Sequence, residues 1–231
     1  MNSPPRGVIT RTAALGLAAL VLALALGYWG VSAWRKGQLE RTVAALVKDS
    51  SDRLAAALAL ETDAATANSA QTVGKLDEHA QEVDQHVIEL HDLGAPTDLA
   101  LVAAAEDYLL TVRQILRQQA ASHRYRVQVT ASEEKLRDHM RTAGRRSGAW
   151  IEEAVRAKDR LEKNYFDYRV SAEALERLLA SYPAVRKKMA SQTRARLLAD
   201  EVVEGARKRT LDGLKRIALN VEQARQLAAV H

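Results

Sequence analysis

Residues 12–34 form a run of 23 positions without a charged side chain, TAALGLAALVLALALGYWGVSAW. An α-helix rises 1.5 Å per residue, so a run of this length can cross a hydrocarbon core about 30 Å thick. The sequence therefore predicts a short N-terminal tail over 1–11, a transmembrane helix over 12–34 and a further domain over 35–231.

A cleaved secretory signal is the alternative to a permanent anchor. Arg6 and Arg11 precede the apolar run, and Val31-Ser32-Ala33 has the small residues of a cleavage site. The run is longer than the apolar region of a usual signal, and aromatic rings that suit a membrane interface stand at its far end. These rings belong to Tyr28, Trp29 and Trp34. We expect an uncleaved, single-pass anchor.

The orientation of the anchor follows from two opposing arguments. Arg35, Lys36, Arg41 and Lys48 follow the span and outnumber the two arginines before it, which favours a cytoplasmic domain. Large domains, however, cross the membrane largely regardless of their charge, and retaining a short basic tail is easier than moving it. We therefore expect a bacterial inner-membrane protein whose C-terminal domain lies in the periplasm.

The chain after the anchor has the composition of long helices. Trp, Tyr and Phe total only 3, 6 and 1 residues, and no segment alternates apolar and polar residues as a strand does. Apolar residues recur at intervals of three and four, and the register slips between Ala67 and Val73 as in a coiled-coil stammer. Gly94 with Pro96, the segment Gly144–Gly148 and Pro183 act as helix boundaries. The sequence predicts an all-α fold, an extended antiparallel bundle or coiled coil of about four helices over 38–93, 98–143, 149–181 and 183–230.

Short connections between such helices imply antiparallel neighbours. In a bundle of these four helices, Pro96 and Pro183 lie far from the membrane, whereas Arg145 and Arg146 return toward it. Two interpretations of this second arginine pair stay open: contact with anionic headgroups beside Arg35 and Lys36, or a solvated turn. The same arrangement brings the basic residues 186–188 toward the acidic stretch 77–107.

One helical face carries residues that could bind a metal. His79, Glu82, His86 and Glu89 follow one another at intervals of three, four and three, so they share a side of the helix. Imidazole and carboxylate together suit a transition metal such as zinc, copper, nickel or iron. Further ligands would have to come from elsewhere, for example Glu106, Asp107 or His123. The alternative is a solvated polar face with no cofactor.

Signals of catalysis and of nucleic-acid binding are lacking in the sequence. Cysteine is absent, and no nucleophile elbow or glycine-rich phosphate loop occurs. The part of the chain from Arg141 onward is rich in Lys and Arg but has no stacking aromatic residues interleaved with them. Tyr165 and Tyr168 have the spacing of core residues rather than of a ligand pocket. We expect a protein that is not an enzyme and does not bind nucleic acid.

The predicted role is a membrane-anchored scaffold or accessory subunit that docks other membrane proteins through helix faces. The Ala-rich residues 54–60 and 64–67 permit close packing, either within the bundle or against a second copy in a homo-oligomer. The shape is similar to the ligand-binding four-helix bundles of bacterial sensory receptors, a resemblance that transfers no residues. It leaves a ligand- or metal-sensing periplasmic domain, acting with a partner, as the alternative function.

Overall fold

The computed structural model describes the backbone of residues 6–60, 69–93, 98–142 and 147–229. Within these ranges, side chains are described from residue 27 to residue 228, Ser69 excepted. The described chain is all-α and contains no strand, as the sequence predicts. Its helices are α1 (Arg6–Leu60), α2 (Ser69–His91), α3 (Leu99–Arg141), α4 (Gly148–Ala190) and α5 (Asp200–Ala229).

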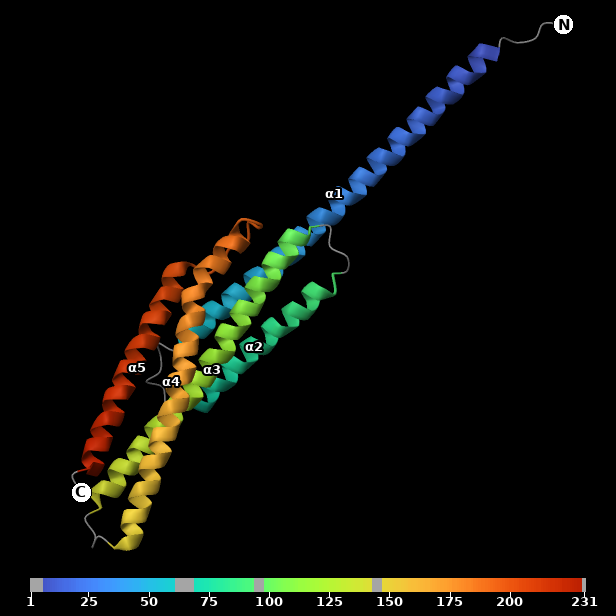
Figure 1. Ribbon diagram of the computed structural model, residues 1–231. Helices are drawn as coiled ribbons and strands as arrows, with labels where there is room; N and C mark the ends of the chain where they lie inside the picture. Colours follow the sequence, from blue (N-terminus) through green and yellow to red (C-terminus); the bar gives the residue numbers. More distant parts are fainter. Residues whose placement is uncertain (1–5, 61–68, 94–97, 143–146, 230–231) are drawn as a thin grey trace, which may run out of the picture.

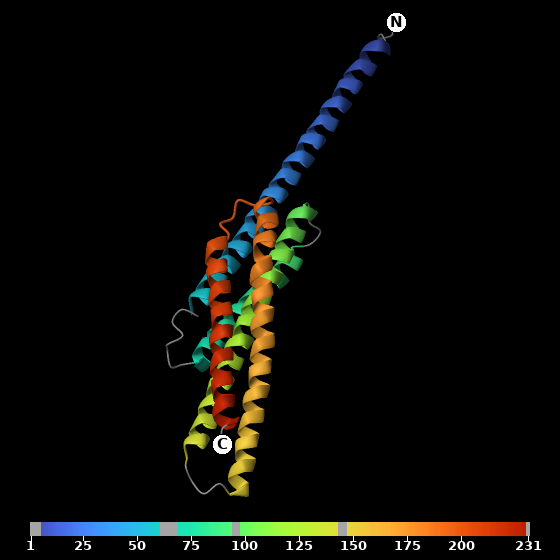
Figure 2. The ribbon, with the colours of Figure 1, turned by 60° about the vertical axis from the view of Figure 1, so that its left-hand side comes forward.

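Successive helices run antiparallel, and α1 extends beyond the bundle as a single rod (Figure 1). Side-chain contacts join the neighbouring helices: Arg53 on α1 pairs with Glu82 on α2, and Arg113 on α3 pairs with Asp84 on α2. Farther along the chain, Gln118 on α3 bonds Ser171 on α4, and Arg207 on α5 pairs with Glu176 on α4. Because successive helices are antiparallel, α1, α3 and α5 point one way, and α2 and α4 the other (Figure 2).

We call the end where α1 leaves the bundle the proximal end; it holds Lys36, Asp98 and the connection 191–199 between α4 and α5. The distal end holds Arg141, Gly148 and the end of α5 (Figure 1). All five helices contribute to the proximal half, whose core includes Val47, Leu54, Leu109, Leu179 and Val203. Only α3, α4 and α5 build the distal half, around Leu136, Leu161 and Val221.

The predicted single helix over 38–93 is two helices, α1 and α2. The register slip before Val73 accompanies this division, with α1 ending at Leu60 and α2 beginning at Ser69. Carbonyls at the end of a helix lack partners within the helix. Here Gln119 Nε2 donates to Ala57 O at 2.9 Å, and Arg209 donates to Leu58 O at 3.3 Å. Side chains of α3 and α5 thus bind two carbonyls in the last turn of α1, which a sequence pattern within α1 cannot show.

The predicted helix boundary at Pro183 is also wrong. Proline lacks an N–H and disfavours a helix interior by about 3 kcal/mol, which is why the sequence predicts a new helix there. Instead α4 continues through Pro183 to Ala190. Tyr182 and Met189, on either side of the proline, are fully buried, and their packing holds the helix together. The chain then leaves the helix at 191–199, inside the segment predicted as the helix 183–230.

The reversal of direction between α1 and α2 exchanges the expected ends of the bundle. Lys36 Nζ lies 3.4 Å from Asp98 Oδ2, so the start of α3 is proximal rather than far from α1's exposed segment. The helix ends Arg141 and Gly148, which flank the second arginine pair, are distal (Figure 1). The expected approach of residues 186–188 to the acidic stretch does occur, because Lys188 pairs with Asp107.

Candidate functional site

The segment of α1 just outside the bundle is the most distinctive exposed surface of the described chain. Tyr28 and Trp29 are each 77% exposed, and Trp34 is 65% exposed. A Cβ added at Gly27, Gly30 or Gly37 meets nothing within 4 Å, so no other element packs against α1 at these three positions. A cluster of large aromatic side chains therefore stands in the open beside the proximal end.

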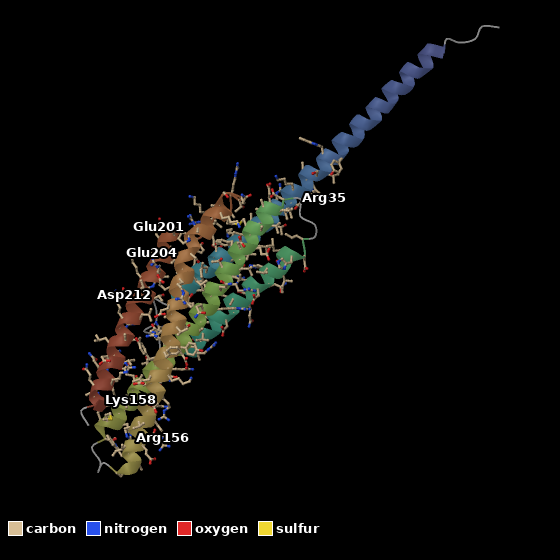
Figure 3. All side chains as sticks on the ribbon, in the orientation of Figure 1. Arg35, Arg156, Lys158, Glu201, Glu204 and Asp212 are labelled. Carbon is tan, nitrogen blue, oxygen red and sulfur yellow. The ribbon has the colours of Figure 1, made fainter. Side chains whose placement is uncertain are left out.

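Two cations follow these rings directly. Arg35 is exposed and lies where α1 meets the bundle (Figure 3). Lys36 is exposed as well but reaches Asp98, whose side chain caps α3 by accepting from Leu101 N at 3.1 Å. This backbone hydrogen bond, aided by Lys36, lowers the pKa of Asp98. Aromatic rings followed by cations form the arrangement that sits at the boundary between lipid and water.

The predicted span itself lies mostly outside the described side chains, which begin at residue 27. The backbone of α1 is helical across all of 12–34. Among the residues open to description, no helix is long and apolar enough to cross a membrane.

The face of α2 predicted to bind a metal turns partly toward α1. His86 Nδ1 lies 2.8 Å from Ser50 Oγ, and its Nε2 lies 3.2 Å from Asp49 Oδ2. Burial lowers the pKa of His86, although Asp49 acts in the opposite direction, and this favours the neutral ring. A neutral ring donates from Nε2 to Asp49 and accepts from the Ser50 hydroxyl, which occupies both nitrogens.

Two other members of that face contact neighbouring side chains, and the third lies apart from them. Glu82 pairs with Arg53, and His79 Nδ1 lies 3.7 Å from Glu82 Oε2. Burial, followed by Arg53, lowers the pKa of His79. Glu89 is exposed on the outer side of α2. No group of three or more His, Asp or Glu side chains in the described ranges is arranged to hold a metal ion.

The remaining predicted ligands do not converge on that face. His91 Nε2 contacts Glu106 at 3.1 Å near the proximal end, while Asp107 pairs with Lys188. His123 is buried, its Nδ1 accepts from Arg126 at 2.8 Å, and its Nε2 has no hydrogen-bond partner. Burial, then the charge of Arg126, lowers the pKa of His123 to about 4. These side chains therefore lie at three separate places in the bundle.

The second arginine pair, Arg145 and Arg146, lies outside the described residues. The flanking helix ends are distal, and so are Arg156 and Lys158 on α4, which lie far from Arg35 (Figure 3). The sequence predicts lipid contact for this pair because it places the pair near Arg35 and Lys36. The flanking helix ends lie instead at the opposite end of the bundle, so that reason does not hold (Figure 1). Tyr168 is buried and Tyr165 packs against the distal core, as their spacing predicts.

The structure adds a groove that the sequence pattern does not reveal. It lies between α1 and the connection 191–199 and carries Arg41 and Lys48 on one side and Arg194 and Arg196 on the other. Its arginines fall inside a segment predicted as helix, so their position could not be anticipated. Exposure alternating with partial burial from Thr193 to Leu197 marks an extended chain.

Comparison with protein families, with curated proteins and with solved structures finds no match to this chain.

Proposed function

We propose that this protein is a single-pass, membrane-anchored helical scaffold or accessory subunit without enzymatic activity, which docks another membrane protein. The anchor is residues 12–34, and the bundle lies on the periplasmic side of a bacterial inner membrane. The observation that supports this proposal best is the continuity of α1 from Arg6 to Leu60.

Continuity matters because one helix is shared between the apolar run and the bundle. Val43, Val47, Leu54 and Leu58 of α1 are buried in the proximal core. A break between the two parts would let the bundle swing freely, whereas an uninterrupted helix transmits orientation. The exposed Tyr28, Trp29 and Trp34 then lie at the expected level of the membrane interface. The bundle is held at a fixed height and angle, which suits a docking platform.

A candidate docking face runs along the outer side of α4. Ile151, Val155, Phe166 and Val170 are exposed, and Phe166 is the only phenylalanine in the chain. Their spacing of four, eleven and four residues keeps them on one side, because eleven residues complete about three turns. We assign this face to an amphipathic helix of a partner membrane protein, which would bury the stripe.

Membrane anchoring is tested by fractionating a bacterial host that expresses the full chain. We expect the protein in the membrane pellet after an alkaline carbonate wash. The variant Leu20→Arg with Leu24→Arg should leave the pellet, since each arginine near the centre of a span costs about 2.5–3.5 kcal/mol of insertion free energy. A parent chain found in the soluble fraction would contradict the proposal. Fusions at His231 determine the side: alkaline phosphatase should be active and β-galactosidase inactive.

Docking is tested by placing a photoreactive benzophenone amino acid at Phe166 in the membrane-embedded chain. A defined crosslinked product containing another membrane protein is expected from this position. Asp212 on the outer side of α5 serves as the matched control position (Figure 3). Equal products from both positions, or none from Phe166, would remove this face from the proposal.

A further inference from the structure

The groove between α1 and the connection 191–199 is open to solvent and has a volume of about 820 Å³. On the α1 side, Arg41, Ala44, Ala45 and Lys48 stand at intervals of three, one and three, so they line one face of the helix. The two alanines leave a low floor between the two cations. The opposite wall is the extended chain that carries Arg194 and Arg196.

The shape of that wall is fixed by its contacts with the core. Thr193 Oγ1 accepts from Ala195 N at 3.2 Å, and Ala195, Leu197 and Leu198 pack against the proximal core. Tyr182 donates its hydroxyl proton to Leu198 O at 3.2 Å. In an extended chain alternate residues face the same way, so Arg194 and Arg196 both face outward and are exposed.

The charge of the groove is largely uncompensated. Glu40 is its only acidic lining residue, against four cations. Lys48 pairs with Asp52 at 2.9 Å, whereas none of the described residues forms an ion pair with Arg41, Arg194 or Arg196. Elsewhere on the bundle, arginines such as Arg113, Arg160 and Arg207 have carboxylate partners. Three arginines that line one groove and have no carboxylate partner among the described residues can form a site for a phosphate, which guanidinium groups bind through paired N–H donors.

The position of the groove indicates where that phosphate comes from. Arg41 follows Trp34 by seven residues, so it stands roughly 10 Å farther along the helix axis. The groove therefore opens at the proximal end, directly beside the proposed membrane interface. Clusters of Lys and Arg close to a membrane surface attract the headgroups of anionic lipids.

We propose that this groove binds the phosphate-bearing headgroup of an anionic phospholipid, held by Arg41, Arg194 and Arg196. The inference rests on the proposed membrane anchor and adds to it a lipid preference. Binding would fix the α4–α5 connection against α1 and so brace the proximal end of the bundle at the membrane.

The test measures thermal unfolding of the full chain in a neutral detergent, followed by circular dichroism at 222 nm. Phosphatidylglycerol, phosphatidylcholine or inorganic phosphate is added at equal phosphate concentration. Phosphatidylglycerol should raise the Tm by roughly 3–6 °C near saturation, and the other two additions should not. Arg194→Gln with Arg196→Gln should abolish the rise. Lys215→Gln with Arg216→Gln, which removes the same charge from exposed positions on α5, should retain it.

The proposal fails if the rise persists in Arg194→Gln with Arg196→Gln, or if the α5 control loses it equally, since either result indicates general charge attraction. An equal rise with phosphatidylcholine, or with inorganic phosphate alone, would also overturn it. Absence of any rise rejects the lipid site while the fractionation experiment still reports on the anchor. The Tm of each variant without lipid shows that it folds.

Discussion

Lys36 Nζ lies 3.4 Å from Asp98 Oδ2, and this ion pair joins the point where α1 leaves the bundle to the first turn of α3. Two residues 62 positions apart in the sequence thereby define which end of the bundle faces the exposed segment of α1. Asp98 has a second role, because its other carboxylate oxygen caps α3 through Leu101 N. The same side chain thus positions a helix start and ties it to the proposed anchor.

The cap at Asp98 can be separated from the ion pair by substitution. Asp98→Ala removes both, and we expect the Tm to fall by roughly 2–4 °C. Asp98→Asn keeps an oxygen that can accept from Leu101 N, so its Tm should stay close to that of the parent. Thermal melts followed by circular dichroism at pH 7 decide between them. An equal loss in both variants would assign the effect to Lys36 rather than to the cap.

The contribution of Asp98 to stability should decrease at low pH. The backbone hydrogen bond from Leu101, with a smaller effect of Lys36, lowers the pKa of the folded-state carboxyl. Its contribution to stability is therefore complete above the unfolded-state pKa of about 4 and is lost as the pH falls through the lower folded-state pKa. The Tm difference between the parent and Asp98→Ala should shrink when the melts are repeated below about pH 4.

A chain of buried hydroxyl groups crosses the proximal core, and it has one proton fewer than it has hydrogen-bond contacts. Ser51 Oγ contacts Val47 O at 2.8 Å and the Tyr108 hydroxyl at 2.7 Å; the Tyr108 hydroxyl in turn lies 2.9 Å from that of Tyr182. Tyr182 also donates to Leu198 O. Three hydroxyl protons serve four contacts, and the carbonyls at both ends only accept. The Tyr108 proton can therefore satisfy only one of its two neighbours.

This proton count predicts opposite costs for two similar substitutions. Tyr108→Phe leaves Ser51 and Tyr182 donating to their carbonyls, so the free energy of unfolding should change by less than about 1 kcal/mol. Tyr182→Phe removes the donor to Leu198 O and should cost about 1–3 kcal/mol. Urea unfolding of both variants measures the difference. A larger loss in Tyr108→Phe than in Tyr182→Phe would show that the shared proton is the important one.

His123 should make the protein less stable in mild acid. Burial, with Arg126 alongside, keeps this ring neutral and lowers its pKa to about 4, compared with about 6.5 in an unfolded chain. The unfolded state therefore takes up a proton first, and the free energy of unfolding should decrease by roughly 2–3 kcal/mol as the pH falls from 7 to 4.5. His123→Leu should flatten this dependence in urea unfolding. His79 and His86, also lowered by burial, leave a residual slope of the same sign.

Of the two side chains that donate to the last carbonyls of α1, Gln119 should be the more sensitive to substitution. Its Nε2 donates to Ala57 O, while its Oε1 is buried without a partner. Gln119→Leu loses the donor but also removes the unpaired oxygen, so we expect a cost of about 1 kcal/mol. The ionised carboxylate of the Gln119→Glu variant cannot donate, and burial raises its folded-state pKa and opposes ionisation. This variant should therefore be more destabilised, increasingly so from pH 5 to pH 8. Urea midpoints at the two pH values test this order.

The sequence identifies the helical class and the bounds of α3 because their signals are local. The observed bounds of α3, 99–141, lie within two residues of the prediction, since Gly94 with Pro96 precedes its apolar pattern and the segment Gly144–Gly148 follows it. Tyr165 and Tyr168 are likewise placed in the core by spacing alone. In contrast, Pro183 is a strong local signal for a boundary, and the burial of Tyr182 and Met189 overrides it.

The metal-binding interpretation shows the limit of a single-helix pattern. Spacing correctly places His79, Glu82 and His86 on one side of α2. It does not reveal that Asp49, Ser50 and Arg53 of α1 occupy that side, because α1 and α2 become neighbours only in the folded chain. The groove at Arg41 and Arg194 is likewise invisible in a single-helix pattern, because it forms only where the folded chain brings the connection 191–199 beside α1.

By itself, the sequence determined the helical class, the apolar run over 12–34 and the faces that must be buried, since these depend on periodicity and on residue chemistry within one segment. The tertiary structure decided where α1 ends, how far α4 continues and which end of the bundle lies beside the exposed aromatic residues. Those outcomes depend on side chains from other helices, such as Gln119 on Ala57 and Lys36 on Asp98. Burial and long-range hydrogen bonds outweigh local preferences there, because they contribute free energies as large as those of the local helix signals.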